Sequence, residues 1–178
     1  MVRHRAMTIV EVLIALAILA IIAAVVLPTT AGQLRQGHAT ALANQLANLR
    51  EAIGNYQENV GAYPISLVQL TNQPANGETD SCGAALSGGE RNNWRGPYIN
   101  HNIVGDMPLG NAVIVATLAR VPNGSAGLLQ IRASSVESDI AGDLEAQFDG
   151  NANFATGTVL WTAAGNGTLT FQIPIRGC

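Results

Sequence analysis

The side chain of Glu11 is the only ionisable group in an apolar run of 21 residues, positions 7–27. At 1.5 Å per residue, a helix of that length roughly matches a hydrocarbon core about 30 Å thick. A carboxylate at membrane depth costs at least about 2.5 kcal/mol, so such a residue indicates a function and a partner that neutralises it. Glu11 is therefore the first candidate functional residue.

Charged residues flank this apolar run unequally. Arg3, His4 and Arg5 precede it, whereas the first charged residue after it is Arg35. Because basic residues favour the cytoplasmic side, the asymmetry predicts a membrane helix with its N-terminus inside and everything downstream outside. Two simpler interpretations stay open. One is a secretory signal peptide, although its apolar region is normally about 7–15 residues long. The other is a plain single-pass anchor, which would leave Glu11 without a role.

Residues 5–28 resemble the N-terminus of type IV pilins and of the pseudopilins of type II secretion. In that family a short basic leader ends in a small residue, and a hydrophobic helix follows with glutamate at its fifth position and proline near position 22. Cleavage after Ala6 makes Met7 the mature start, Glu11 the fifth residue and Pro28 the twenty-second. The family usually has glycine in place of Ala6 and phenylalanine in place of Met7. The resemblance covers about the first 30 residues.

The resemblance implies a processing pathway and an assembly. A prepilin peptidase would cleave between Ala6 and Met7, the new N-terminus would be methylated, and an inner-membrane platform would assemble identical subunits into a helical filament. An amine on Met7 beside Glu11 of a neighbouring subunit would convert two costly buried charges into one neutral pair. Because buried pairs are best attested as devices that fix register, we interpret Glu11 as the residue that sets subunit register.

The resemblance also implies a location and a use. The subunit would be in the bacterial inner membrane before assembly, and afterwards in an extracellular pilus or a periplasmic pseudopilus. A pilus would serve adhesion, motility or DNA uptake. A pseudopilin of type II secretion is the alternative within the family, and a membrane-anchored binding module that does not polymerise is the alternative from another class.

The sequence pattern and the resemblance together predict an α+β, type IV pilin-like fold, with a long N-terminal helix packed on an antiparallel sheet of about four strands. From Leu34 to Val60 a stripe of residues, apolar except for His38, recurs every three or four positions, so one side of the helix must be covered. Pro28 should kink the helix, because it removes an amide donor. The predicted parts are a leader (1–6), a transmembrane and assembly helix (7–28), its amphipathic continuation (29–62), a variable loop region (63–111) and the sheet (112–178).

Strand character appears in four segments: 112–121, 128–133, 158–163 and 169–175. The last alternates regularly, and Pro174 within it should lie at a sheet edge or strand end. One helix, 135–148, should interrupt the sheet, with Ser134 and Glu137 in a capping-box pattern and Gly150 closing its end.

Cys82 and Cys178 are the only two cysteines. In an exported domain such a pair predicts a disulfide, and closing a loop of nearly 100 residues would contribute about 4–5 kcal/mol in the chain-entropy model. Two cysteines without a histidine cluster do not make a zinc site. Residues 149–153 resemble the start of a calcium loop but lack the later glycine and acid of an EF-hand, and turn chemistry explains them equally well. We therefore predict neither a metal nor a cofactor.

The sequence contains no nucleophile elbow, metal-binding helix or phosphate loop, and only His38 and His101 remain after processing. A catalytic site would need His101, Asp106 and a serine to converge, which nothing in their spacing suggests. Twelve acids against seven arginines leave the mature chain near −5, so no nucleic-acid partner is indicated. We expect a structural subunit and not an enzyme.

Overall fold

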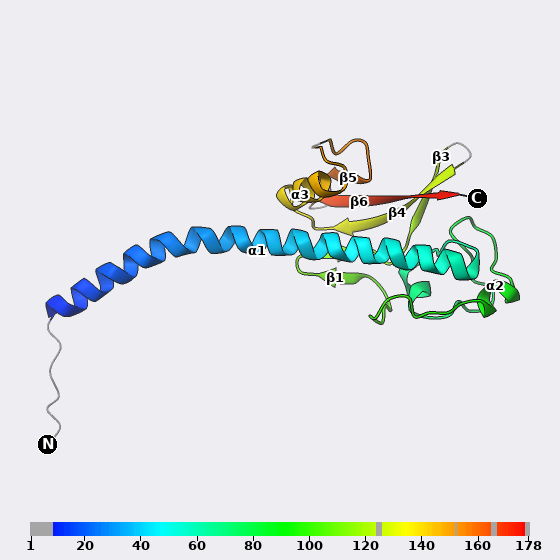
Figure 1. Ribbon diagram of the computed structural model, residues 1–178, viewed down its shortest axis with the longest axis horizontal. Coiled ribbons are helices and arrows are strands. Elements are labelled where there is room, and N and C mark those ends of the chain that lie inside the picture. The colour runs from blue at the N-terminus through cyan, green and yellow to red at the C-terminus, as the bar shows by residue number, and fades with distance from the viewer. Residues whose placement is uncertain (1–8, 124–125, 152, 165–166, 177–178) are drawn as a thin grey trace, which may run out of the picture. The chain divides into compact units, whose positions relative to one another are not determined.

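The computed structural model describes residues 9–123, 126–151, 153–164 and 167–176, without the side chains of residues 25–32, 123 and 126. The chain divides into two compact units, Met1–Gly37 and His38–Cys178. A single long helix, α1 (Ile9–Val60), supplies most of the first unit and the first element of the second. In Figure 1 the colour follows the chain from blue near the N-terminus to red near the C-terminus.

The helix α1 is continuous through position 28 and ends at Val60. Gly61 follows with φ 85° and donates its N–H to the Gln57 carbonyl at 2.8 Å, so the helix end expected at residues 61–64 is confirmed. The side chain of Pro28 lies outside the described residues, and the kink there stays a prediction. Within the described parts of the chain, no helix has a stretch both long enough and apolar enough to cross a membrane. The predicted transmembrane half is therefore not confirmed.

One face of α1 forms the centre of the core of the second unit. Leu46, Leu49, Ile53 and Tyr56 are fully buried, and they share one hydrophobic cluster with residues of every strand except β3. The periodicity of three and four residues thus predicted the covered face correctly over this part of the helix. Leu34 and His38, which continue the same stripe towards the N-terminus, are exposed.

The sheet has six strands, all paired antiparallel. Two nine-residue strands, β4 (Ala126–Ser134) and β6 (Thr168–Arg176), lie side by side at its centre. One edge of β4 pairs with β2 near Ser134 and with β3 along residues 126–130, while β5 covers part of the free edge of β6. The shorter strands are β1 (Met107–Leu109), β2 (Ala112–Ile114), β3 (Ala119–Asn123) and β5 (Val159–Thr162).

The prediction of about four strands was wrong. The expected strand 112–121 is divided into β2 and β3, because its middle leaves β4 and pairs with the loop after α1: Leu67 donates to the Ala116 carbonyl and Leu118 to the Ile65 carbonyl. The strand β1 lies in the region 63–111 that was predicted to be a loop. It was not predicted, because three residues are too few to show an alternating pattern.

Pro174 lies where the sequence predicted, beside a local sheet edge. It is opposite Leu128 of β4, but β5 begins only at Val159, whose partner is Phe171. The side of β6 at Pro174 therefore needs no N–H donor for strand pairing, and the proline ring is exposed.

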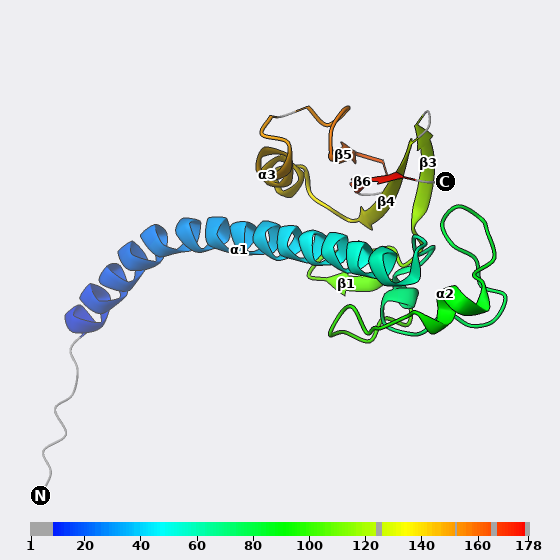
Figure 2. The same ribbon diagram turned by 45° about the vertical axis from the view of Figure 1, so that its right-hand side comes forward.

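The interrupting helix is α3 (Ser138–Phe148), which lies beside β5 in both views (Figures 1 and 2). The capping box predicted for Ser134 and Glu137 is wrong. Ser134 pairs with Thr168 as the last residue of β4, and Glu137 is the N-cap without a side-chain cap bond. Gly150 closes the helix as expected, with φ 68° and its N–H directed to the Glu145 carbonyl at 3.1 Å.

The loop region contains two short helices. They are the 3-10 helix η1 (Leu67–Leu70) and the helix α2 (Gly88–Asn92). A capping box holds α2: the Ser87 hydroxyl accepts the Glu90 N–H, and the Glu90 carboxylate accepts the Ser87 N–H. Glu90 is three residues after Ser87, so the signal was present in the sequence.

Gly167 is a position where only glycine fits. Its φ is 88°, and a Cβ there would overlap the carbonyl oxygen of Val136, which accepts the indole N–H of Trp161 at 2.9 Å. Gly167→Ala should lower the free energy of unfolding by more than about 2 kcal/mol, since backbone strain alone costs about 1–3 kcal/mol. Thermal unfolding measures this. The control is Gly142→Ala in α3, where a Cβ meets nothing within 4 Å; equal effects of the two changes would contradict this account.

Candidate functional site

The described N-terminal part of α1 presents an almost wholly apolar surface. Every described side chain from Ile9 to Ala24 is exposed, and the large hydrophobic ones among them are 42–80 % exposed. Soluble monomers rarely expose a continuous apolar patch of more than a few hundred Å². This surface therefore indicates an interface with other molecules, and we refer to residues 9–24 as the apolar surface.

Glu11 is the only charged residue of the apolar surface and lies in the first turn of α1. N–H groups in a first turn have no acceptor within the helix, and the helix dipole there stabilises a carboxylate by about 0.3–1 kcal/mol. That amount is smaller than the cost of about 2.5 kcal/mol for a carboxylate at membrane depth. The helix dipole alone would therefore not offset the cost of covering Glu11.

The other residues predicted from the resemblance lie outside the described residues. Ala6 and Met7 precede Ile9, the Pro28 side chain falls within 25–32, and Cys178 follows Arg176. Cys82 is described: it lies half-buried in the loop before α2, and its backbone N–H donates to the Asp80 carboxylate at 2.9 Å. The roles of these residues stay predictions.

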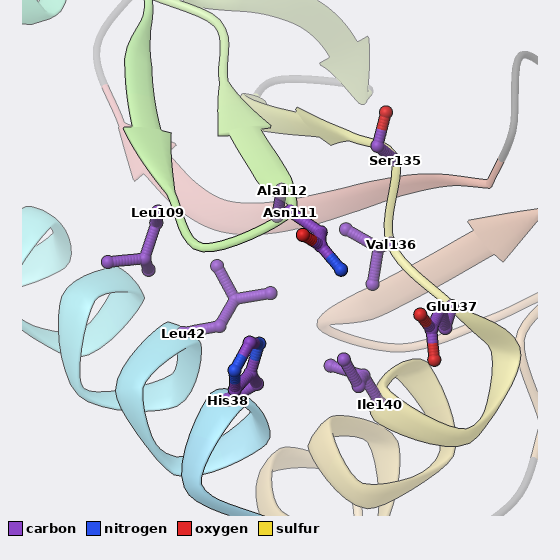
Figure 3. Close-up of a pocket in the computed structure, with 9 residues that line it drawn as sticks. All are labelled: His38, Leu42, Leu109, Asn111, Ala112, Ser135, Val136, Glu137 and Ile140. Atoms are coloured by element: carbon purple, nitrogen blue, oxygen red, sulfur yellow. The ribbon is translucent and has the colours of Figure 1, made fainter. Parts of the chain in front are cut away.

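A small pocket lies in the second unit where three segments meet (Figure 3). The part of α1 at His38 and Leu42, the turn between β1 and β2, and the connection from β4 to α3 each form one side. Its enclosed volume is about 10 Å³, which is the space of about one water molecule, so it is too small for a substrate or cofactor. The lining residues are His38, Leu42, Leu109, Asn111, Ala112, Ser135, Val136, Glu137 and Ile140.

Asp149, the C-cap of α3, organises the loop that leads to β5. Its carboxylate accepts the backbone N–H groups of Thr158 and Val159, each at 2.8 Å. Burial alone would raise the pKa of Asp149, but these hydrogen bonds outweigh burial and lower it. Gly157 has φ 121°, and a Cβ there would lie 2.6 Å from the Asp149 Oδ2 atom, so the carboxylate occupies the place of a side chain.

Glu145 lies one helical turn before Asp149 and has no exposed surface. Among the described residues, neither of its carboxylate oxygens has a hydrogen-bond partner. Burial raises the pKa of Glu145, and the negative charge of Asp149 raises it further. The two shifts therefore have opposite directions: the surroundings favour the ionised form of Asp149 and the neutral form of Glu145.

The structure gives residues 149–153 the role of a turn. The Asn151 side-chain oxygen accepts the Asn153 N–H at 2.8 Å, and the Asn153 oxygen accepts the Ala155 N–H at 3.2 Å. Within the described residues, no three His, Cys, Asp or Glu side chains gather as metal ligands. Turn chemistry, one of the two interpretations from the sequence, therefore accounts for the bonds that these side chains make.

The histidine and acid considered for catalysis have separate surroundings. The Asp106 carboxylate accepts the Ala116 N–H at 2.8 Å, which fixes the chain between β2 and β3. His101 lines an open groove on α1 whose described lining includes neither Asp106 nor a serine. The arrangement described here offers no nucleophile–base pair.

Glu145 was not among the candidate residues found from the sequence. The buried residues of α3 are Ala141, Leu144 and Glu145. A signal was available, because Glu145 follows Ala141 by four positions and so shares its face.

Glu145→Gln should change how stability depends on pH. In the natural chain, the contribution of Glu145 to stability is fully present below its unfolded pKa, about 4.3, and is lost as pH rises through the raised folded value. Glutamine cannot ionise, so the melting temperature of the variant relative to the natural chain should rise with pH. Thermal unfolding over a pH series tests this, with the exposed N-cap change Glu137→Gln as control. A difference that stays constant with pH would contradict the raised pKa of Glu145.

Comparison with known proteins finds one match. Residues 1–27 match the family described as the prokaryotic N-terminal methylation motif. No curated protein and no solved structure matches the chain. The matched segment contains Glu11 and the apolar run, and it confirms the resemblance that residues 5–28 show. The N-terminus therefore carries the methylation motif that is the signature of type IV pilins and pseudopilins.

Proposed function

We propose that this chain is a structural subunit of a type IV pilus-like filament, held together by its N-terminal helices. The observation that carries the proposal is the apolar surface at residues 9–24, which is exposed throughout, contains one carboxylate and lies within the methylation motif. Packing the apolar surfaces of several copies side by side would remove each from water. Each Å² of apolar surface buried stabilises the assembly by about 25 cal/mol.

The proposal includes a stage in the membrane before assembly. The 21-residue apolar run and the basic residues before it support insertion with the N-terminus in the cytoplasm. A prepilin peptidase would hydrolyse the peptide bond between Ala6 and Met7, and the products would be the leader and a free α-amino group. That amine has an ordinary pKa near 8, so it is mostly protonated at neutral pH.

Pairing between subunits would then involve Met7 and Glu11. The cationic amine of an arriving subunit would meet the Glu11 carboxylate of a neighbour already in the filament. Within a bundle of apolar helices, an unpaired Glu11 is costly, so positions of the helix that leave it unpaired are disfavoured. The carboxylate thereby selects one axial position among the many that would bury the apolar surface equally well.

A pseudopilin of a type II secretion system is the second candidate, because the methylation motif is shared by both groups. The same helix packing would operate in it, and only the extent and location of the filament would differ. Neighbouring genes for a secretin and secreted hydrolases would favour the pseudopilin, and a retraction ATPase with adhesion genes would favour the pilus. Neither candidate requires catalysis by this chain.

Glu11→Gln should reduce filament yield at least tenfold. Removing one partner of a buried ion pair costs about 3–5 kcal/mol, and glutamine keeps the shape of the side chain but not its charge. The measurement is electron microscopy and quantification of sheared cell-surface material. Glu58→Gln, an exposed change near the other end of α1, is the control. Normal filament yield from Glu11→Gln would exclude the register role.

The amine–carboxylate pair can also be captured chemically. The chain has no lysine, so the mature α-amino group is its only aliphatic amine. A carbodiimide joins amines to carboxylates that already touch, and it should link Met7 of one subunit to Glu11 of the next. Mass spectrometry of the digested filament identifies the linked peptides. Links from Met7 to other carboxylates, with none to Glu11, would contradict the proposed pairing.

The proposed disulfide has its own test. If Cys82 and Cys178 pair, the mature protein should weigh two hydrogens less than its reduced form. Loss of the disulfide should remove the stabilisation of about 4–5 kcal/mol that loop closure contributes. This should lower the melting temperature by about 8–20 °C. Cys82→Ser, Cys178→Ser and the double change should have equal effects, because each removes the same bond. Additive effects in the double change would show that the two cysteines act separately.

A further inference from the structure

An open groove of about 390 Å³ runs between α1 and the segment after Tyr98. Gln45, Asn48, Glu51 and Asn55 line the α1 side, at spacings of three, three and four residues that put them on one helix face. Asn100 and His101 face them from the loop. Ala52 lies between them and is buried. Because its side chain is small, the groove is deeper at this position. All these residues belong to the second unit.

The polar side chains of this groove are not used by the fold. Among the described residues, the side chains of Asn48, Glu51, Asn55, Asn100 and His101 make no hydrogen bond to the protein. Gln45 makes one weak contact, from its amide nitrogen to the Met107 sulfur at 3.8 Å, and its amide oxygen stays available. Six polar groups from two segments thus converge on one space with most of their hydrogen-bonding capacity unused.

A second groove of similar size shows the contrast. It lies against η1, and its polar side chains are engaged within the fold: Gln69 donates to Glu78 at 2.8 Å, and the Ser66 hydroxyl accepts the Val68 N–H at 3.1 Å. That groove is the outer surface of a hydrogen-bonded loop. The groove on α1 is the one whose side chains are free to bind a ligand.

We propose that the groove on α1 binds a neutral saccharide of one or two rings. Each amide side chain presents a donor and an acceptor together, which matches neighbouring hydroxyl groups that donate and accept in turn, and Glu51 accepts from hydroxyl donors. Tyr98, which is half-buried, lines the same groove. The volume lies within the range of about 300–1,000 Å³ for small-ligand sites.

Other ligand classes fit the lining less well. No arginine is among the described residues that line the groove and the chain has no lysine, so phosphate and sulfate groups would find no fixed positive charge there. An extended peptide pairs with a sheet edge or inserts apolar side chains into pockets, and here there is neither a strand nor a deep apolar floor. A neutral ligand rich in hydroxyl groups remains the best chemical match.

The test uses the purified full chain kept in zwitterionic detergent, because glycosidic detergents would compete for the groove. Cellobiose, lactose and N,N′-diacetylchitobiose are the probes, and a triglycine peptide is the comparison. Saturation-transfer NMR detects binding and a titration gives the dissociation constant. We expect at least one disaccharide to bind, with Asn48→Ala and Asn55→Ala each weakening it about fivefold, the effect of losing one hydrogen bond.

Two control variants lie on the exposed surface of the same helix outside the groove, Asn44→Ala and Glu58→Gln, and should leave binding unchanged. Asn48 and Asn55, like the two control positions, are exposed, so thermal unfolding should show all variants folded. Failure of every disaccharide to bind would overturn the proposal, as would equal binding by groove and control variants or preferential binding of triglycine. These outcomes do not depend on filament formation, since they are measured on the unassembled chain.

Discussion

The second unit depends on the burial of one face of α1. Tyr56, without exposed surface, makes an edge contact with Tyr98 at 5.7 Å between ring centroids, and Tyr98 makes another with Trp94 at 5.8 Å. The indole N–H of Trp94 donates to the Gln69 carbonyl at 2.9 Å. A row of aromatic side chains thus fixes a long loop that has few strand pairs of its own. Without the buried helix face, this loop would have little apolar surface to pack against.

The two parts of α1 obey opposite constraints. Between Leu42 and Val60, apolar residues occupy one face and polar residues the others, which suits a helix that covers a sheet. Between Ile9 and Ala24, apolar residues surround the helix, and no described residue covers them. Because helix propensity is adequate in both parts, the difference lies in what each can bury. The apolar face between Leu42 and Val60 is covered by other residues of the same chain. The apolar surface between Ile9 and Ala24 requires other molecules to cover it.

Features that depend on local sequence were predictable. The buried face of α1, the strand alternation of β6 and the glycine ends at Gly61 and Gly150 all follow from spacing or from a single residue type. Features that depend on distant partners were not. The division of the expected strand at 112–121 follows from pairing with the loop near Leu67, and the end of β4 at Ser134 follows from pairing with Thr168. Glu11 was found from sequence because a lone charge in an apolar run is a local property.

Glu145 and Glu11 show two ways in which one chain can accommodate an acid in an apolar setting. Glu145 is enclosed by the fold, and burial together with the negative charge of Asp149 raises its pKa, so protonation lowers the cost of enclosing this acid. Protonation needs no second subunit, so a single chain can accommodate Glu145 by itself. Glu11 lies in an exposed apolar surface, and a proton would make it neutral in every axial position alike. Only a partner with a fixed place, such as the terminal amine of another subunit, could make its energy depend on position. For this reason the acid on the apolar surface, and not the enclosed one, is suited to direct assembly.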